Sequence, residues 1–523
     1  GMFAFSVWDV KKEECFLARD RVGKKPLVYY HDGGLFIFGS EIKAVLEDKR
    51  VDRALNFRAI SDFFTYGYVP SPKTVFSNIH KLPPAHTAHL SSGGLKIRRY
   101  WLPDYGAKIY LSDDSAYGER IAELLDEAVR MRLVSDVPLG LFLSGGIDSS
   151  AVLAFMSAHL KDPVKTFSIG FDDAAYNELA YASYTAHKYD TEHKEFVVKV
   201  DAAGVIPKLV WHYNEPFGDS SCIPTYYVSE MTRTGVTVAL SGDGGDEAFG
   251  GYNRYIAFGY LMGGGRTGRA LTRAALALAK TAGPLMGRKN NDYMARLGDA
   301  AASPGEMYRQ YMRVIGIFPD ADIFTPAFLD ELRGYDSAEY FMDKFAGLTA
   351  SDRREAAMDL DFTTYLPEDL MVKADIASMA NSLEVRSPFL DHKMLEFVFR
   401  MPFEKKVGFF RTKVLLRAFL KKRGLIPDEI LARRKQGFAV PVGEWFKGPL
   451  KDYYRDMMSG SAFIRAGFMD RASVDRMFEE HVSGRRDHTH RLWCVLNFEL
   501  WYKIFVEGVS PDSLASGRRK CAG

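Results

Sequence analysis

Hydrophobic and polar residues alternate with a period of two along much of the first hundred positions. The alternation is clearest at 3–9 and recurs at 14–20, 27–30 and 35–38. The last two segments are joined by His31-Asp32-Gly33-Gly34, which is typical of a β-hairpin turn. A period of two indicates strands with one buried face, so we expect a β-rich region up to about residue 104.

Near residue 115 the period changes, and apolar residues recur at spacings of three and four, as on one face of a helix. The residues of this predicted face are Ile121, Leu124, Leu125, Ala128 and Val129. Further along, strand-like runs at 139–143, 164–169, 195–198 and 236–240 alternate with helical segments. This order predicts an α/β fold with a parallel sheet covered on both faces.

The stretch after residue 265 is mainly helical. The change of period places a domain boundary within 103–112, so we expect one domain at 1–104 and a second at 105–523. A chain of 523 residues is long enough for two such domains, each with its own core.

The composition of the chain is typical of a globular protein and argues against several other classes. Hydrophobic residues make up 47% of the chain, which is ordinary for a globular protein, and its formal net charge of +2 predicts neither a nucleic-acid partner nor a trap for acidic substrates. The four cysteines are scattered without a CxxC pair, which argues against a disulfide framework or a zinc site. No signal peptide or run of about 18 apolar residues is visible. We therefore expect a cytoplasmic protein without a membrane or nucleic-acid partner.

The first candidate site is the segment Leu143-Ser144-Gly145-Gly146-Ile147-Asp148-Ser149-Ser150, which follows an apolar strand and precedes a helical run. Glycines let backbone N–H groups converge, and a helix N-terminus adds positive potential for an anion. The segment therefore predicts a phosphate-binding loop. It is not a Walker A loop, because no Gly-Lys-Ser/Thr follows at the required spacing.

A second glycine-rich loop, Ser241-Gly242-Asp243-Gly244-Gly245-Asp246-Glu247, also follows a short strand. Three acidic side chains in one tight loop repel each other, and a divalent cation would relieve that repulsion. Magnesium favours a few carboxylates together with substrate phosphates. Ligands of open parallel sheets bind beyond the carboxyl ends of the strands, so we expect both loops to lie at one site.

These two loops, together with 382–391, 433–441, 214–221 and the opening residues 1–5, closely resemble the glutamine-hydrolysing asparagine synthetases of the B type. The resemblance runs almost from end to end. It implies an ATP pyrophosphatase (adenine nucleotide alpha hydrolase-like) domain with a helical C-terminal part at 105–523. It also implies a partial glutamine amidotransferase type 2 domain, of the N-terminal-nucleophile class, at 1–104.

The implied reaction is a ligase reaction with ATP and Mg²⁺. The side-chain carboxylate of aspartate attacks the α-phosphate to give β-aspartyl-AMP and pyrophosphate, and ammonia then yields asparagine and AMP. The resemblance assigns ATP or pyrophosphate contacts to Leu143, Ser144, Gly145, Gly146, Asp148, Ser149, Ser150, Ile169, Ser241 and Gly242. It assigns the metal to Asp148 and Asp246. Ile169 is equally suited to be a plain buried strand residue.

The resemblance also assigns catalytic roles. Lys435 is a mobile-loop cation suited to the α-phosphate and to a later oxyanion. Asp243 and Glu384 are both candidates for the general base, and Glu384 could instead form a salt bridge with Arg386. Two departures from the family pattern, Ile376 after Asp375 and Asn214, put substrate contacts near them in doubt.

The family's glutaminase nucleophile is an N-terminal cysteine, and the segment bearing it is expected upstream of Gly1. Cys15 is not a substitute, because it lies mid-strand without a free α-amino group. Either the sequence is an incomplete fragment, or the protein uses ammonia or another amine; in both cases we expect ammonia as the donor for this chain. The family resemblance favours a homodimer.

Alternatives remain. A related amidoligase or amidotransferase could use the same adenylation on another carboxylate, as in a β-lactam or macrolactam cyclase or a glycan amidotransferase. An RNA-modifying enzyme with the same loop should show catalytic cysteines or a basic platform, and this chain shows neither. A non-catalytic scaffold would not require Asp148, Asp246 and Lys435 together.

Overall fold

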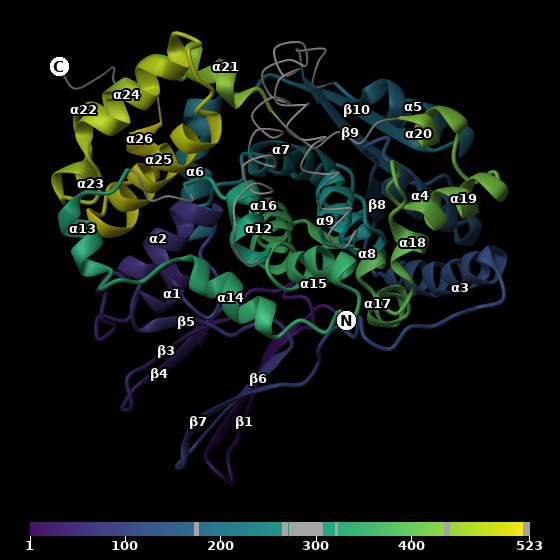
Figure 1. The fold of residues 1–523 in the computed structure, drawn as a ribbon, viewed down its shortest axis with the longest axis horizontal. Coiled ribbons are helices and arrows are strands. Elements are labelled where there is room, and N and C mark those ends of the chain that lie inside the picture. Colours follow the sequence, from purple (N-terminus) through teal and green to yellow (C-terminus); the bar gives the residue numbers. More distant parts are fainter. Residues whose placement is uncertain are drawn as a thin grey trace.

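The computed structural model describes residues 1–171, 177–263, 307–318, 323–433 and 440–515, together with the single residues 270 and 296 (Figure 1). Within these ranges, no helix combines the length and the apolar character needed to cross a lipid bilayer.

The N-terminal region consists of two antiparallel sheets, ordered β1-β2-β6-β7 and β4-β3-β5. Their strands are β1 (Ala4–Asp9), β2 (Glu14–Arg19), β3 (Val28–His31), β4 (Phe36–Gly39), β5 (Ile79–Lys81), β6 (His86–Ser91) and β7 (Gly94–Arg99). A small apolar core that includes Cys15 and Leu17 of β2, Tyr29 of β3 and Ala88 of β6 joins the two sheets. The β3–β4 pair forms the hairpin that the sequence predicts.

The centre of the molecule is a parallel sheet ordered β10-β9-β8-β11-β12. Its strands are β8 (Leu139–Phe142), β9 (Lys165–Phe171), β10 (Glu192–Val198), β11 (Val238–Leu240) and β12 (Glu384–Arg386). In β11, the consecutive residues Ala239 and Leu240 belong to two different apolar clusters. Because consecutive strand residues point to opposite faces, both faces of the sheet are buried at β11, as expected for the interior of a parallel sheet.

Helices surround this sheet and form most of the C-terminal part (Figure 1). The helices up to residue 263 are α1 (Ile42–Val45), α2 (Phe57–Tyr66), α3 (Asp114–Arg132), α4 (Ile147–His159), α5 (Leu179–Lys188), α6 (Ala202–Tyr213), α7 (Cys222–Arg233), α8 (Gly245–Phe249) and α9 (Asn253–Gly263). The next are α12 (Met307–Ile315), α13 (Pro326–Glu331), α14 (Ala338–Ala346), α15 (Ala356–Thr363), α16 (Met371–Met379), α17 (His392–Phe399), α18 (Phe403–Lys406), α19 (Val414–Lys422) and α20 (Asp428–Ala432). The last are α21 (Val442–Lys447), α22 (Lys451–Ser459), α23 (Ala462–Arg465), α24 (Arg471–Val482), α25 (Thr489–Trp501) and α26 (Pro511–Leu514).

The predicted helix near residue 115 is α3, and all five residues of its predicted apolar face are buried. The side chain of Asp113 caps this helix by accepting a hydrogen bond from the backbone N–H of Ala116. Between the end of β7 and the start of α3 the chain forms neither helix nor strand, and the boundary that we predict at 103–112 falls in this connection.

Two strands differ from the sequence-based expectation. β10 begins at Glu192 rather than at residue 195, because its first residues are polar and lie at the edge of the sheet, where no hydrophobic signal is needed. β12 was not expected as a strand. It has only three residues, all partly exposed, and pairs with β11 alone.

The N-terminal region contacts the central one where two glycines meet. Gly67 ends α2 in a left-handed conformation with φ of 85°, and its carbonyl accepts a hydrogen bond of 2.6 Å from the N–H of Gly218. A Cβ atom on Gly218 would lie 2.7 Å from the Cα of Gly67, so the two backbones can approach this closely only with glycine. This contact fixes the segment that follows Gly218, which forms one wall of the candidate site.

Candidate active site

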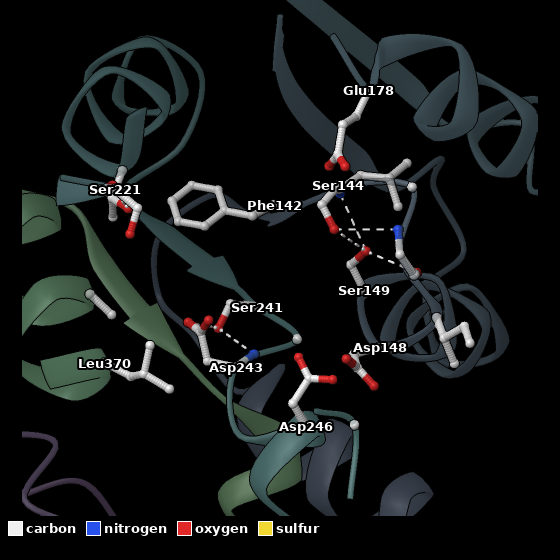
Figure 2. A pocket seen from close by; sticks show the side chains of 18 of the residues that line it. Phe142, Ser144, Asp148, Ser149, Glu178, Ser221, Ser241, Asp243, Asp246 and Leu370 are labelled. Carbon is white, nitrogen blue, oxygen red and sulfur yellow. Dashed lines mark hydrogen bonds between the residues drawn. The ribbon is translucent and has the colours of Figure 1, made fainter. Parts of the chain in front are cut away.

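A cavity of about 490 Å³ lies beyond the carboxyl ends of β8, β9 and β11 (Figure 2). Most of the site residues that the sequence predicts line it: Leu143, Ser144, Gly145, Gly146, Asp148, Ser149, Ile169, Ser241, Gly242, Asp243 and Asp246. The structure thus brings the two glycine-rich loops to one place, as expected from their positions after strands of a parallel sheet.

The first loop, between β8 and α4, is held in a conformation that requires glycine. Gly145 has φ of 64°, and a Cβ atom there would lie 2.6 Å from the backbone nitrogen of Ala182. The hydroxyls of Ser144 and Ser149 lie 3.1 Å apart, and the N–H of Gly146 donates to the Ser144 hydroxyl. Hydroxyl groups and the N-terminus of α4 therefore face the same end of the cavity, which suits an anion such as pyrophosphate.

The second loop leads from β11 into α8. Gly244 has φ of 85°, and a side chain there would collide with Leu390. The Ser241 hydroxyl donates a hydrogen bond of 2.8 Å to the Asp243 carboxylate, which keeps that side chain folded against its own loop (Figure 2). Asp243 lines the cavity and is held in one orientation, so it can act on a bound substrate.

Asp148 and Asp246, from different loops, point toward one another (Figure 2). Both form ion pairs with the ammonium group of Lys413, which lies 2.6 Å from Asp246 Oδ1. A Cβ atom on Gly245 would lie 2.6 Å from the Cγ of Asp148, so the absence of a side chain there lets the loops come together.

The closeness of these two carboxylates bears on whether the site could hold magnesium. Two carboxylates that share one nitrogen atom are close enough to share a divalent cation, and hard oxygen ligands suit Mg²⁺. In the described part of the chain, no group of three or more His, Cys, Asp or Glu residues forms a metal site.

A second charged group forms another wall of the cavity. The ammonium of Lys373 lies 2.7 Å from Asp219 Oδ2 and 2.8 Å from the Ser221 hydroxyl. Burial would raise the pKa of Asp219, but the charge and hydrogen bond of Lys373, together with hydrogen bonds from Ser221, outweigh burial and lower that pKa to about 2. Behind this pair, burial and the nearby Asp219 raise the pKa of Asp369 well above its ordinary value, which favours its protonated form.

Two predicted residues lie outside the cavity lining, and the position of a third is not described. Ser150 is fully buried in α4, with its hydroxyl 3.2 Å from that of Thr185, and it does not line the cavity. Glu384 lies in β12, also outside the cavity lining, and pairs with Arg386 at 2.7 Å. Lys435 lies outside the described residues. Ile169 is both buried and part of the cavity wall.

Sequence reasoning missed several cavity residues. Lys413 follows the exposed aromatic pair Phe409 and Phe410, and no glycine-rich motif marks it. Arg417, one helical turn later, and Arg433, which pairs with Glu178, also line the cavity. The only signal for Arg433 is its place at the start of the 433–441 motif, two residues before Lys435.

The cysteines of the described residues are not activated. Cys15, Cys222 and Cys494 are all buried as free thiols, and burial raises the pKa of each. A thiol of this kind is a poor nucleophile. Cys15 is a core residue of β2, as its sequence position predicts.

Comparisons with known proteins agree with the geometry. A family model described as asparagine synthase matches residues 120–503, and one described as a glutamine amidotransferase domain matches residues 1–101. A putative asparagine synthetase (glutamine-hydrolyzing) of Mycobacterium tuberculosis is 33% identical over 526 residues, which cover 97% of this chain and 77% of the relative. Asparagine synthetase (glutamine-hydrolyzing) 1 of Bacillus subtilis is 30% identical and covers 97% of this chain and 78% of its own length. Amidase chyE of Penicillium rubens is 27% identical over 90% of this chain and 74% of its own length. The chain belongs to the asparagine synthase family.

Proposed function

We propose that this protein is an ATP-dependent ligase that converts aspartate to asparagine through β-aspartyl-AMP. The observation that carries the proposal is the meeting of Asp148 and Asp246, from two glycine-rich loops, in one cavity at the carboxyl ends of parallel strands. Family membership and the names of the relatives support it.

The first half-reaction forms a bond between a side-chain oxygen of aspartate and the α-phosphorus of ATP, and pyrophosphate leaves. We propose that the departing pyrophosphate binds to Ser144, Ser149 and the N-terminus of α4, which face the same end of the cavity. Magnesium, held by Asp148 and Asp246, would neutralise negative charge on the phosphates. We assign Lys435 the same stabilising role at the α-phosphate.

In the second half-reaction, ammonia attacks the acyl carbon and AMP leaves. The attacking amine must lose a proton, and the general base has to be within reach of it. Asp243 lines the cavity and Glu384 does not, which favours Asp243 as the base. We propose ammonia as the immediate nitrogen donor at this cavity.

The identity of the carboxylate substrate, proposed to be aspartate, can be tested directly. Pyrophosphate release should be measured with Mg²⁺ and ATP, in the presence and absence of aspartate, and with ammonium or glutamine as donor. We expect release that requires aspartate, asparagine as a product with ammonium, and a large loss in Lys435→Ala.

If aspartate does not increase release and Lys435→Ala behaves like the wild type, the asparagine proposal fails. Because relatives named amidases also span most of the chain, a panel of other carboxylates would then be tested in the same assay. Release with a different acid would favour a related amidoligase.

A further inference from the structure

A lysine occupies the position between the two carboxylates that are proposed to hold magnesium. The side chain of Lys413 is only 4% exposed, and those of Asp148 and Asp246 are 15% and 10% exposed. Its ammonium group pairs with both carboxylates. A buried ammonium is stable only where its charge is matched, and here two carboxylates match it.

The backbone conformation at Lys413 and the space around its side chain favour this position of the lysine. Lys413 has φ of 52°, a left-handed conformation that is uncommon for a residue other than glycine. Its carbonyl accepts a hydrogen bond of 2.9 Å from the N–H of Arg417 at the start of α19. On the opposite side, a Cβ atom on Gly251 would lie 2.5 Å from the Cε of Lys413, so the lysine stem fits against a bare backbone.

We propose that Lys413 is a resident counterion of the metal site, and that a divalent cation enters only by displacing its ammonium group from Asp148 and Asp246. The inference rests on the proposed function, because it takes these two carboxylates as the magnesium ligands. An ammonium group and a divalent cation cannot share one position between the same oxygens, because like charges at contact distance repel strongly.

The exchange has a consequence for the order of binding. The metal alone must separate Lys413 from both of the carboxylates that neutralise its charge. A nucleotide brings phosphate charges into the same cavity, which compensate the displaced ammonium. The site is therefore set to take a metal together with nucleotide and to disfavour the metal alone.

The test is the affinity of the nucleotide-free, full-length protein for Mn²⁺, measured by electron paramagnetic resonance. Lys413→Met and Lys413→Gln remove the resident charge, and we expect each to bind Mn²⁺ at least about tenfold more tightly than the wild type. Lys413→Arg keeps a cation and should bind as weakly as the wild type. Without metal, Lys413→Met should melt at a lower temperature, and Mn²⁺ should restore the loss.

Arg417 provides the matched control for general electrostatics. It lines the same cavity and lies in the field of Asp148 and Asp246, but its guanidinium donates to the carbonyls of Thr412 and Leu431. Arg417→Met removes one positive charge without vacating the position between the carboxylates. We expect its Mn²⁺ affinity to rise by much less than that of Lys413→Met.

Two outcomes would overturn the inference. One is an unchanged or weaker Mn²⁺ affinity in both Lys413→Met and Lys413→Gln, and the other is an equal gain in Arg417→Met. Asp148→Asn and Asp246→Asn separate this failure from a failure of the metal assignment. If they leave Mn²⁺ binding in the presence of an ATP analogue unchanged, the proposed magnesium ligands themselves are wrong.

Discussion

Lys413 and Lys373 both line the cavity and both contact aspartates, but the carboxyl groups around them differ. Around Lys413, two carboxylates from two loops converge on one ammonium group. Around Lys373, Asp219 is strongly ionised, whereas the pKa of Asp369 is raised well above its ordinary value by burial and by Asp219. Two carboxylates therefore face the ammonium of Lys413, whereas one ionised carboxylate faces that of Lys373.

This difference separates two tasks. Two carboxylates that converge on one ammonium group can exchange it for a divalent cation, as proposed for Asp148 and Asp246. The buried pair of Lys373 and Asp219 is already balanced in charge, so a divalent cation would not be favoured there. The pair instead fixes the positions of its two side chains. The Lys413 end is therefore suited to the phosphates, whereas the Lys373 end is suited to hold the cavity wall and orient a substrate against it.

The largest effect is expected at Asp246. Asp246→Asn removes one of the two proposed metal ligands, and we expect pyrophosphate release with aspartate and ammonium to fall about a thousandfold. Asp136→Asn is the matched control, because Asp136 is exposed and precedes β8 at the end opposite to the cavity. Wild-type activity in both variants would show that the two carboxylates do not carry the phosphate chemistry.

Asp219 tests the opposite end through stability. Asp219→Asn leaves the buried Lys373 without its carboxylate partner, and urea unfolding should show a loss of about 3 kcal/mol. The double variant Asp219→Asn/Lys373→Met should recover part of this loss, because it removes the unpaired charge. A double variant less stable than either single one would show that the pair is not the stabilising unit.

The same variant makes a prediction about pH. The pKa of Asp219 is about 2 in the folded protein, below its ordinary 3.8. Its carboxylate therefore stabilises the fold above about pH 4, and this contribution, about 2 kcal/mol, is lost as the pH falls toward 2. Asp219→Asn should lack this part of the acid dependence in urea unfolding measured between pH 6 and 2.

Asp243 lies near both groups of charges. It is on the same loop as Asp246, and its charge contributes to the raised pKa of Lys373, which burial alone would lower. If it is the general base, Asp243→Asn should slow asparagine formation about a hundredfold while a first turnover of pyrophosphate release persists. Asp243→Glu retains a carboxylate and should recover much of the rate. Equal loss of both steps in Asp243→Asn would instead assign it to adenylation.

The loop end of the cavity was predictable because its signals are local. Glycines and aspartates directly after apolar strands specify tight loops, and the topology of a parallel sheet brings such loops to one edge. These two facts predict that Asp148 and Asp246 meet. They do not predict Lys413, because its placement depends on how the segment between α18 and α19 packs over the second loop, which no local pattern reports.

The Lys373 end was less predictable for a related reason. Asp219 and Lys373 are 154 positions apart, and Asp219 is fixed by the contact of Gly218 with Gly67 in the N-terminal region. Sequence motifs identify the two segments separately, but they do not predict that the segments contact each other. It likewise could not decide between Asp243 and Glu384, because only the register of β12 against β11 places Glu384 beside Val238, two residues before the strand's carboxyl end.

Glu384 gives the smallest expected effect. Its side chain is 39% exposed, and its partner Arg386 also donates to the carbonyls of Arg132 and Val134 at 2.8 Å. Glu384→Gln keeps an oxygen that accepts from Arg386, so we expect less than about 1 kcal/mol of lost stability. Asparagine formation should fall less than about threefold, because the side chain does not line the cavity. Urea unfolding and product formation measure the two effects. A hundredfold loss of amide formation in a normally stable Glu384→Gln would move the general base from Asp243 to β12, and would require the cavity to open toward that strand when substrates bind.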